Sequence, residues 1–122
     1  AQDYKFEIDE ERNIIKVDSV IRQVVEDILD GRSLAEISAK FHFSVARLIE
    51  SIAHRIRDTR RLNRVVLSGG VFQNMLLLSS TIRLLRLRGF EVFTHSRVPA
   101  NDGGISLGQA VVANARLATG RI

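Results

Sequence analysis

The sequence contains no cysteine and no tryptophan, and its single proline is Pro99. Without cysteine the chain cannot form disulfides, thiol nucleophiles or cysteine-ligated metal sites. Aromatic residues make up only 6%, which argues against an aromatic platform for single-stranded nucleic acid. No apolar run reaches the roughly 18 residues of a membrane-spanning helix, and no signal peptide is recognisable. We therefore expect a cytoplasmic protein without a membrane partner.

Charge is distributed unevenly along the 122 residues. Residues 1–31 carry 4 basic and 9 acidic side chains, whereas residues 32–122 carry 14 basic and 5 acidic ones. Fifteen of the 18 basic residues are arginine, which binds carboxylate and phosphate well. Two interpretations are open: nucleic-acid binding, or a solvated surface that meets an acidic partner. Because no helix-turn-helix or basic arm accompanies the arginines, the second is favoured and nucleic acid is not expected as a partner.

The pattern of apolar residues predicts an α/β fold in a single domain, with helices and a hairpin before a βαβα unit. Residues 1–31 are predicted to form an acidic hairpin and then a helix that Asp18 N-caps. Residues 32–63 are predicted to form two helices. The first begins with the capping box of Ser33 and Glu36, and the second begins near Ser44.

Residues 64–122 show a different pattern. Short apolar strands at 64–68 and 90–94 are each followed by a helix, at 73–88 and from about 105 to 118. Alternation of strand and helix with these lengths is typical of parallel strands joined by a crossover helix. Ligands of open α/β sheets bind where such strands end, so the loops at this edge are the first candidates for a site.

The first of these loops is Ser68-Gly69-Gly70-Val71-Phe72-Gln73-Asn74. Two glycines allow a phosphate to approach the backbone closely, and the following helix begins with unpaired N–H groups. Asn74 can offer an amide to a ribose or an acyl group. Glycines are also common in strand-to-helix turns for geometry alone, so both interpretations are open for Gly69 and Gly70.

The second loop is Val98-Pro99-Ala100-Asn101-Asp102-Gly103-Gly104. A carboxylate at this position can hold a divalent metal that bridges to phosphate oxygens. The alternative is that Asp102 simply N-caps the last helix. The three histidines, His42, His54 and His95, lack the spacing of a zinc site. We interpret His42 as packed rather than catalytic, find no base for Ser68, and assign no catalytic residue.

Together the two loops resemble one known pair. The strings Val65-Val66-Leu67-Ser68-Gly69-Gly70-Val71-Phe72-Gln73-Asn74 and Val98 to Ala110 are similar to the C-terminal part of the HypF carbamoyltransferase family, which matures nickel–iron hydrogenase. Phe41-His42-Phe43-Ser44-Val45-Ala46 resembles a further segment of that family. The resemblance runs from about residue 18 to 115.

The resemblance implies an actin-like ATPase fold (ASKHA, Kae1-like), of which this chain forms part of one lobe. It makes Asp102 a metal ligand, and His42 is a possible site residue without an assigned role. The nucleotide-binding residues that it implies are Ser68, Gly69, Gly70, Asn74 and Gly103.

The family uses carbamoyl phosphate and ATP, through carbamoyl-adenylate, to carbamoylate the C-terminal cysteine of the partner HypE. The resemblance therefore implies ATP and a divalent metal as cofactors. The family's acylphosphatase-like, zinc-finger and YrdC-like domains, and the histidine pair that completes its metal site, do not occur within these residues. We expect the 122 residues alone to be an inactive fragment that depends on those N-terminal domains.

Two alternatives stay open. Antibiotic O-carbamoyltransferases and the tRNA threonylcarbamoyl proteins share the fold and a Gly-Gly-Val loop. In a third hypothesis the chain is a non-catalytic, arginine-rich interaction module whose glycines are only structural.

Overall fold

A computed structural model describes residues 3–120 of the chain. The elements in chain order are β1 (Glu7–Asp9), β2 (Ile14–Lys16), α1 (Asp18–Leu29), α2 (Leu34–Arg60), β3 (Arg64–Leu67), the 3-10 helix η1 (Gly70–Gln73), α3 (Met75–Leu87), β4 (Glu91–Thr94), the 3-10 helix η2 (Asp102–Gly104) and α4 (Ile105–Ala118). The mixed helix and strand content confirms the α/β class. Within the described range, no helix is both long enough and apolar enough to cross a bilayer.

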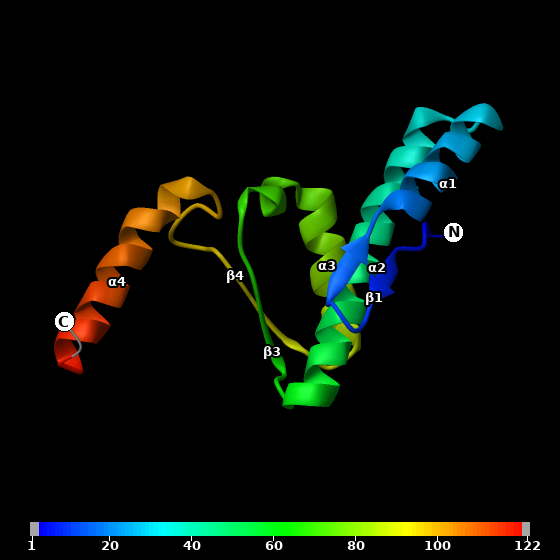
Figure 1. Ribbon diagram of the computed structural model, residues 1–122. Coiled ribbons are helices and arrows are strands. Elements are labelled where there is room, and N and C mark those ends of the chain that lie inside the picture. The colour runs from blue at the N-terminus through cyan, green and yellow to red at the C-terminus, as the bar shows by residue number, and fades with distance from the viewer. Residues whose placement is uncertain (1–2, 121–122) are drawn as a thin grey trace.

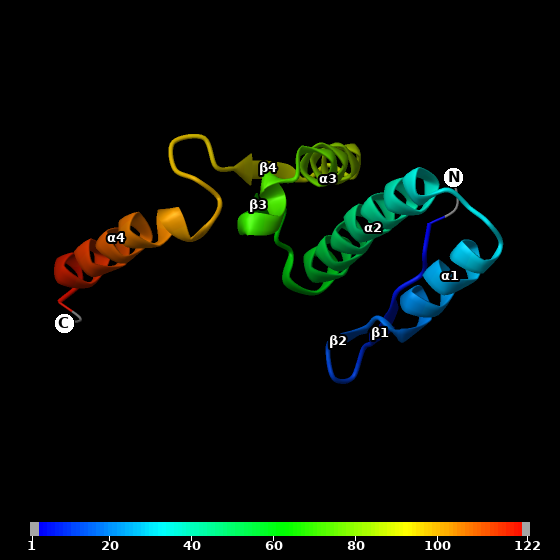
Figure 2. The same cartoon turned by 90° about the horizontal axis from the view of Figure 1, so that it is seen from above.

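Helix α2 is the central element. It lies between the hairpin with α1 on one side and α3 with the sheet on the other (Figures 1 and 2). Helix α4 extends away from this body in both views. The predicted hairpin is confirmed, because β1 pairs antiparallel with β2.

The prediction of two helices over residues 32–63 is wrong, since α2 runs unbroken from Leu34 to Arg60. Its start is as predicted: Ser33 Oγ accepts from the Glu36 N–H at 3.2 Å, and Glu36 Oε2 accepts from the Ser33 N–H at 3.1 Å. Ser44, the expected second start, is instead 1% exposed in the middle of the helix.

The Ser44 hydroxyl explains why the helix continues. It donates to the carbonyl of Lys40, one turn earlier, at 2.6 Å, and accepts from the Tyr4 N–H at 2.6 Å. A serine whose hydroxyl binds the preceding turn is satisfied within a helix and does not need a terminus. Ser44 therefore fastens the N-terminal segment to α2.

The predicted cap of α1 is also wrong. Val17 occupies the N-cap position without a side-chain hydrogen bond, and Asp18 lies in the first turn. There its negative charge still faces the positive end of the helix dipole.

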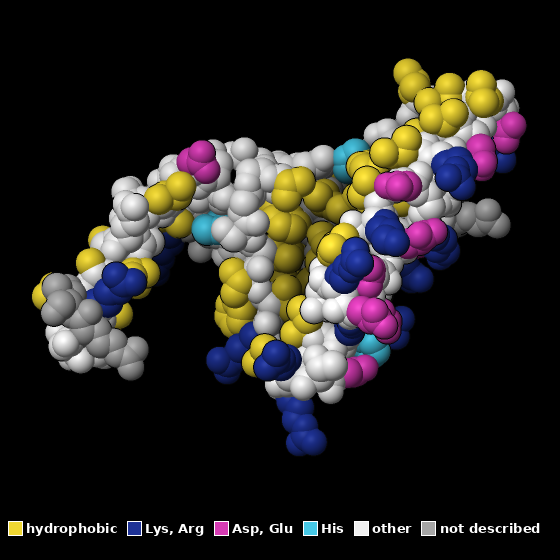
Figure 3. All heavy atoms as spheres, in the orientation of Figure 1, with side chains coloured by type: hydrophobic (Ala, Val, Ile, Leu, Met, Phe, Trp, Pro, Cys, Tyr) yellow, Lys and Arg dark blue, Asp and Glu magenta, His cyan; other side chains and the backbone are white. Residues whose placement is uncertain are grey.

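The strands β3 and β4 are parallel and paired in register, as predicted, with Val65 opposite Val92 and Val66 opposite Phe93. Side chains alternate between the faces of a strand. One face packs on α3 around the buried cluster of Leu67, Leu85 and Phe90. On the other face Val66 is 69% and Phe93 45% exposed. Figure 3 shows hydrophobic side chains on both sides of β3, with the larger group between β3 and α2, whereas charged side chains follow α1 and α2.

A polar cluster joins the N-terminal segment to α1 and α2. The buried Tyr4 donates its hydroxyl to Asp27 Oδ2 at 2.7 Å, and Lys40 Nζ lies 3.0 Å from the same oxygen and 4.3 Å from the Tyr4 ring centre. Burial, followed by the bond to Asp27, raises the pKa of Tyr4 to about 12. The hydrogen bonds from Tyr4 and Lys40 hold the pKa of Asp27 below its ordinary value.

The role of Ser44 is testable. Replacing Ser44 by alanine leaves the buried Tyr4 N–H without its acceptor, and we expect the free energy of unfolding to fall by about 1–3 kcal/mol. Ser51→Ala, at an exposed position of the same helix, should change it by less than about 0.5 kcal/mol. Urea titration of both variants measures the difference. Equal stability of the two would show that Ser44 does not fasten the segment.

The Tyr4 cluster predicts a pH dependence. A tyrosine whose pKa is raised in the folded state stabilises that state at neutral pH, and this stability is lost as the pH rises from 10 towards about 12. Asp27 acts in the opposite direction, because its lowered pKa gives stability that is lost as the pH falls below 3.8. Since Tyr4 is the only tyrosine, Tyr4→Phe should remove the tyrosine part of the alkaline loss in thermal unfolding. An unchanged alkaline limb in that variant would contradict the assignment.

Candidate functional site

The two loops named from the sequence meet at one edge of the sheet. Because β3 and β4 are parallel neighbours, the loops that follow them leave from the same end. The Gly69 N–H then donates to the carbonyl of Ala100 at 2.8 Å. This hydrogen bond joins the loop of Ser68 to the loop of Asp102.

The two glycines of the first loop do different things. Gly69 has φ +106°, a conformation that residues with a Cβ rarely adopt. Gly70 has an ordinary φ, and a Cβ placed on it would meet no atom within 4 Å. Within residues 3–120, no oxygen accepts from the Gly70 N–H. Neither packing nor conformation requires glycine at position 70, and its N–H is open to a ligand.

Asn74 lies at the N-cap of α3, one residue before the helix rather than inside it as expected. Its Oδ1 accepts from the Leu77 N–H at 3.2 Å, which fixes the orientation of the amide. Its Nδ2 then donates to His42 Nε2 at 2.8 Å. The amide NH2 carries a second proton, which Asn74 can still offer to a ligand.

His42 is half-buried in α2 and binds at both ring nitrogens. Its Nδ1 lies 2.7 Å from the carbonyl of Ser38, which can only accept, so Nδ1 carries the proton and Nε2 accepts from Asn74. The neutral ring is therefore part of the support for α3. Both nitrogens are occupied, which agrees with its interpretation as a packed residue.

A pairing that the sequence analysis missed lies beside Gly69. His95 Nε2 is 2.7 Å from Ser68 Oγ. The signal was present in the register: residues 64–67 pair with 91–94, so one further step places 68 beside 95. The statement that Ser68 lacks a neighbouring base is wrong.

Asp102 does not N-cap the last helix, so the alternative to metal binding that the sequence offered is wrong. Asn101 takes that role in η2, because its Oδ1 accepts from the Gly103 N–H at 2.9 Å. Gly104 stands at the N-cap of α4 without a side-chain bond. The Asp102 carboxylate is exposed and makes no ion pair within the described part of the chain.

A complete metal site cannot be built from the described residues. Nowhere between residues 3 and 120 do three or more histidine, aspartate or glutamate side chains gather at metal-binding distance. Asp102 is one oxygen donor, and Ca²⁺ or Mg²⁺ needs six or more ligands, with water supplying a share. The residues here therefore do not fit a self-contained metal centre.

Gly103 and Gly104 are required by packing. A Cβ on Gly103 would lie 2.9 Å from Pro99 Cγ, and one on Gly104 would lie 2.9 Å from the Pro99 carbonyl oxygen. The Gly103 N–H is taken by Asn101. Gly103 thus shapes the loop that presents Asp102.

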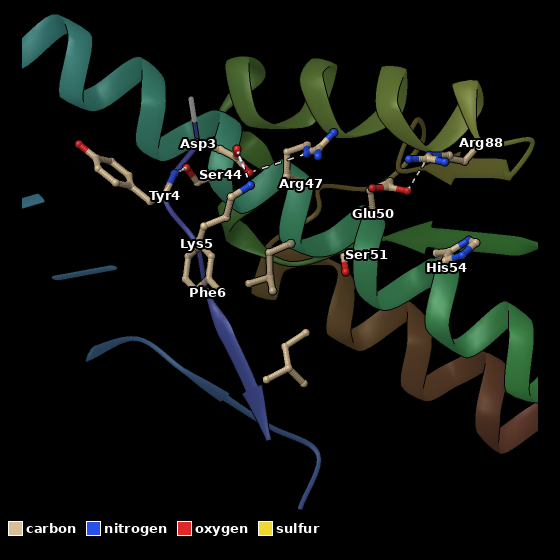
Figure 4. Close-up of a pocket in the computed structure, with 12 residues that line it drawn as sticks. Asp3, Tyr4, Lys5, Phe6, Ser44, Arg47, Glu50, Ser51, His54 and Arg88 are labelled. Atoms are coloured by element: carbon tan, nitrogen blue, oxygen red, sulfur yellow. Dashed lines mark hydrogen bonds and ion pairs between the residues drawn. The ribbon is translucent and has the colours of Figure 1, made fainter. Parts of the chain in front are cut away.

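Two hollows of the surface border α2, and the larger of them has His42 in its lining. A cavity of about 340 Å³ between the N-terminal segment and α2 is lined by charged side chains that pair with one another (Figure 4). Asp3 lies 2.9 Å from Lys5 and 3.8 Å from Arg47, and Glu50 lies 3.0 Å from Arg88. Each carboxylate of this lining is already paired, with Asp3 shared between two cations, so the side chains mainly hold one another. A larger hollow of about 680 Å³ is mainly apolar, with Phe43 and Leu76 in its lining.

Some of the clustered arginines hold neighbouring elements together. Arg57 donates to the Arg88 carbonyl at 2.6 Å, and its guanidinium carbon lies 4.1 Å from the Phe90 ring centre. Arg64 bonds Glu91 across the sheet at 3.2 Å. These contacts join α2, α3 and the strands.

The model of the family described as "Carbamoyltransferase, Kae1-like Domain, second subdomain" matches residues 1–109. The carbamoyltransferase HypF of Rhodobacter capsulatus is 40% identical over 87 residues, which make up 71% of this chain and 12% of that protein. The chain thus spans a small part of the relatives that it matches.

Two solved structures extend the likeness to the fold. A full-length HypF, crystallised in the phosphate- and nucleotide-bound form, matches with TM-score 0.90 and 49% identity over 95% of this chain and 16% of its own. The HypF of T. kodakarensis matches with TM-score 0.77 and 30% identity over 98% of this chain and 15% of its own. The chain belongs to the HypF carbamoyltransferase family and corresponds to part of its Kae1-like domain.

Proposed function

We propose that the chain is the C-terminal part of a carbamoyltransferase that uses carbamoyl phosphate and ATP to carbamoylate the C-terminal cysteine of HypE. One observation carries the proposal beyond the family. The Gly69–Ala100 hydrogen bond brings the open Gly70 N–H, the Ser68 hydroxyl and the loop of Asp102 to one sheet edge. Anion donors on one loop and an exposed carboxylate on the adjoining loop suit a nucleotide phosphate and its counter-ion.

In this proposal the first loop binds the phosphate of carbamoyl-adenylate. The Gly70 N–H and Ser68 hydroxyl donate to phosphate oxygens, and Gly69 provides the turn that aims them. When the cysteine thiolate of HypE attacks the carbamoyl carbon, the bond to the phosphate oxygen breaks and AMP leaves. Negative charge then increases on the phosphate, so fixed donors at this position stabilise the transition state more than the bound substrate.

Asn74 and His42 have a supporting part in this proposal. Their 2.8 Å bond fixes the start of α3, and the loop before α3 is the one that meets the phosphate. The second amide proton of Asn74 is available to the ribose or acyl group. Gly103 holds the second loop in the shape that exposes Asp102.

We also propose that Asp102 supplies one ligand to a divalent metal whose other ligands come from outside these 122 residues. Within the full-length protein the chain would form one domain with three parts, residues 1–31, 32–63 and 64–122, and would act together with domains that precede it. In this proposal the reaction takes place in the cytoplasm. Family membership favours these roles over a non-catalytic interaction module, because the related proteins are named carbamoyltransferases.

Gly70→Ala tests whether the first loop binds a ligand. Because the added methyl meets no atom of the chain, we expect the free energy of unfolding to stay equal or rise by up to about 1 kcal/mol. ATP binding to the full-length protein should weaken about tenfold or more, because the methyl enters the space beside the donating N–H.

Gly108→Ala is the matched control. It lies in α4, a Cβ there also meets nothing within 4 Å, and it should leave ATP binding unchanged. Calorimetric titration measures both variants. ATP binding by Gly70→Ala as tight as that of the original protein would mean that the glycine serves no ligand.

Asp102→Asn tests the transfer reaction. With full-length protein, HypE, carbamoyl phosphate, ATP and a divalent metal, we expect transfer of the labelled carbamoyl group to HypE to fall by about 100-fold or more. Asp30→Asn, an exposed aspartate after α1, should retain full transfer. Mass spectrometry of HypE measures the product. Transfer to tRNA in place of HypE, in the unmodified protein, would favour the threonylcarbamoyl relatives instead.

A further inference from the structure

Ser68 and His95 form a pair at the edge of the sheet where the two loops begin. Ser68 Oγ and His95 Nε2 are 2.7 Å apart, which is a short hydrogen bond for these atoms. Ser68 is the first residue after β3, and His95 is the first after β4. Both side chains are exposed, so a ligand at the loop can reach the serine.

The pairing follows from the register of the strands. Residues 64–67 of β3 pair with 91–94 of β4 in parallel. In-register neighbours of a parallel sheet point to the same face, so the next positions, 68 and 95, meet as a consequence of strand pairing. The pairing of the strands therefore holds His95 beside Ser68.

The direction of this hydrogen bond decides what Ser68 can do. A serine hydroxyl has one proton and two lone pairs. If it donates to His95, it presents only lone pairs to a phosphate and repels it. If His95 carries its proton on Nε2 and donates, Ser68 accepts, and its own proton is free to point into the loop.

Building on the proposed function, we propose that His95 is a positioning residue that donates to Ser68 and thereby turns the Ser68 hydroxyl proton toward the nucleotide phosphate. The acceptor role of Ser68 toward His95 and its donor role toward the phosphate are then parts of one chain of hydrogen bonds. Such chains polarise their members, so each bond strengthens the next.

The same pair could be taken for a nucleophile and its base. In that arrangement a third group holds the other nitrogen of the histidine. No side chain or carbonyl between residues 3 and 120 is hydrogen-bonded to His95 Nδ1. The open Gly70 N–H beside Ser68 is also a donor to an anion, which agrees with a phosphate-directed hydroxyl.

The first experiment is a double-mutant cycle on nucleotide affinity in the full-length protein. We expect His95→Ala and Ser68→Ala each to weaken ATP binding about tenfold, the effect of one hydrogen bond to a charged group. The double variant should bind ATP as tightly as the single variant with the lower affinity, because both changes remove the same donor. Adenosine, which has no phosphate, should bind to all four proteins equally, whereas a merely structural role of His95 would weaken adenosine as well.

Two further variants sharpen the cycle. His95→Gln keeps an N–H donor at a similar reach and should restore most of the ATP affinity lost in His95→Ala. His54→Ala removes a histidine of α2 that faces Asp58. It should leave the affinities for ATP and for adenosine unchanged. Additive losses in the double variant, or no rescue by glutamine, would overturn the proposal.

The proton position gives a readout that survives misfolding of any variant. Nitrogen–proton correlation spectra of the unmodified protein, with the His95 signals assigned, show which ring nitrogen is protonated. We expect Nε2–H in the presence of ATP, and an Nδ1–H ring with a bare Nε2 would contradict the proposal. The outcomes distinguish the proposed function from the role of His95. Failure of the unmodified protein to bind ATP would overturn the proposed function, whereas ATP binding that does not change in His95→Ala would overturn only the role of His95.

Discussion

The parallel pairing of β3 with β4 is the constraint on which the candidate site depends. Each strand has four residues, yet their register decides which loop residues meet. It places Ser68 beside His95 and brings the backbone of Gly69 to the carbonyl of Ala100. The same pairing buries Leu67 against α3, so the strands that align the loops are also part of the core.

Apolar packing holds one part of the chain together, and polar contacts hold the rest. A small cluster around Leu67, Leu85 and Phe90 holds the strands to α3, and polar side chains fasten the rest. Ser44 secures the N-terminal segment, and Arg57 bridges α2 to the end of α3. Parallel sheets are ordinarily covered on both faces. In the part of the chain described here, one face is covered by α3 and the other exposes Val66 and Phe93.

Much of the fold could be read from local patterns. The capping box at Ser33, the strand-helix-strand order after residue 63 and the loops at one sheet edge all follow from short-range chemistry. The sequence did not reveal that α2 is a single helix, because Ser44 is a residue type that often begins a helix. Its hydroxyl instead donates to the Lys40 carbonyl and accepts from the Tyr4 N–H, 40 residues earlier in the chain, and the second contact arises only in the tertiary structure.

The candidate site shows the same division. The sequence by itself identified the glycines, the serine and the aspartate as candidate site residues. These residue types in these loops indicate a phosphate site and carry the family resemblance. Only the tertiary structure decided that Asn101 caps the turn and leaves Asp102 free, that Asn74 binds His42, and that Ser68 has His95 as its neighbour. The reason is physical: a side chain's chemistry is local, whereas its hydrogen-bond partner depends on strand register and helix packing over tens of residues.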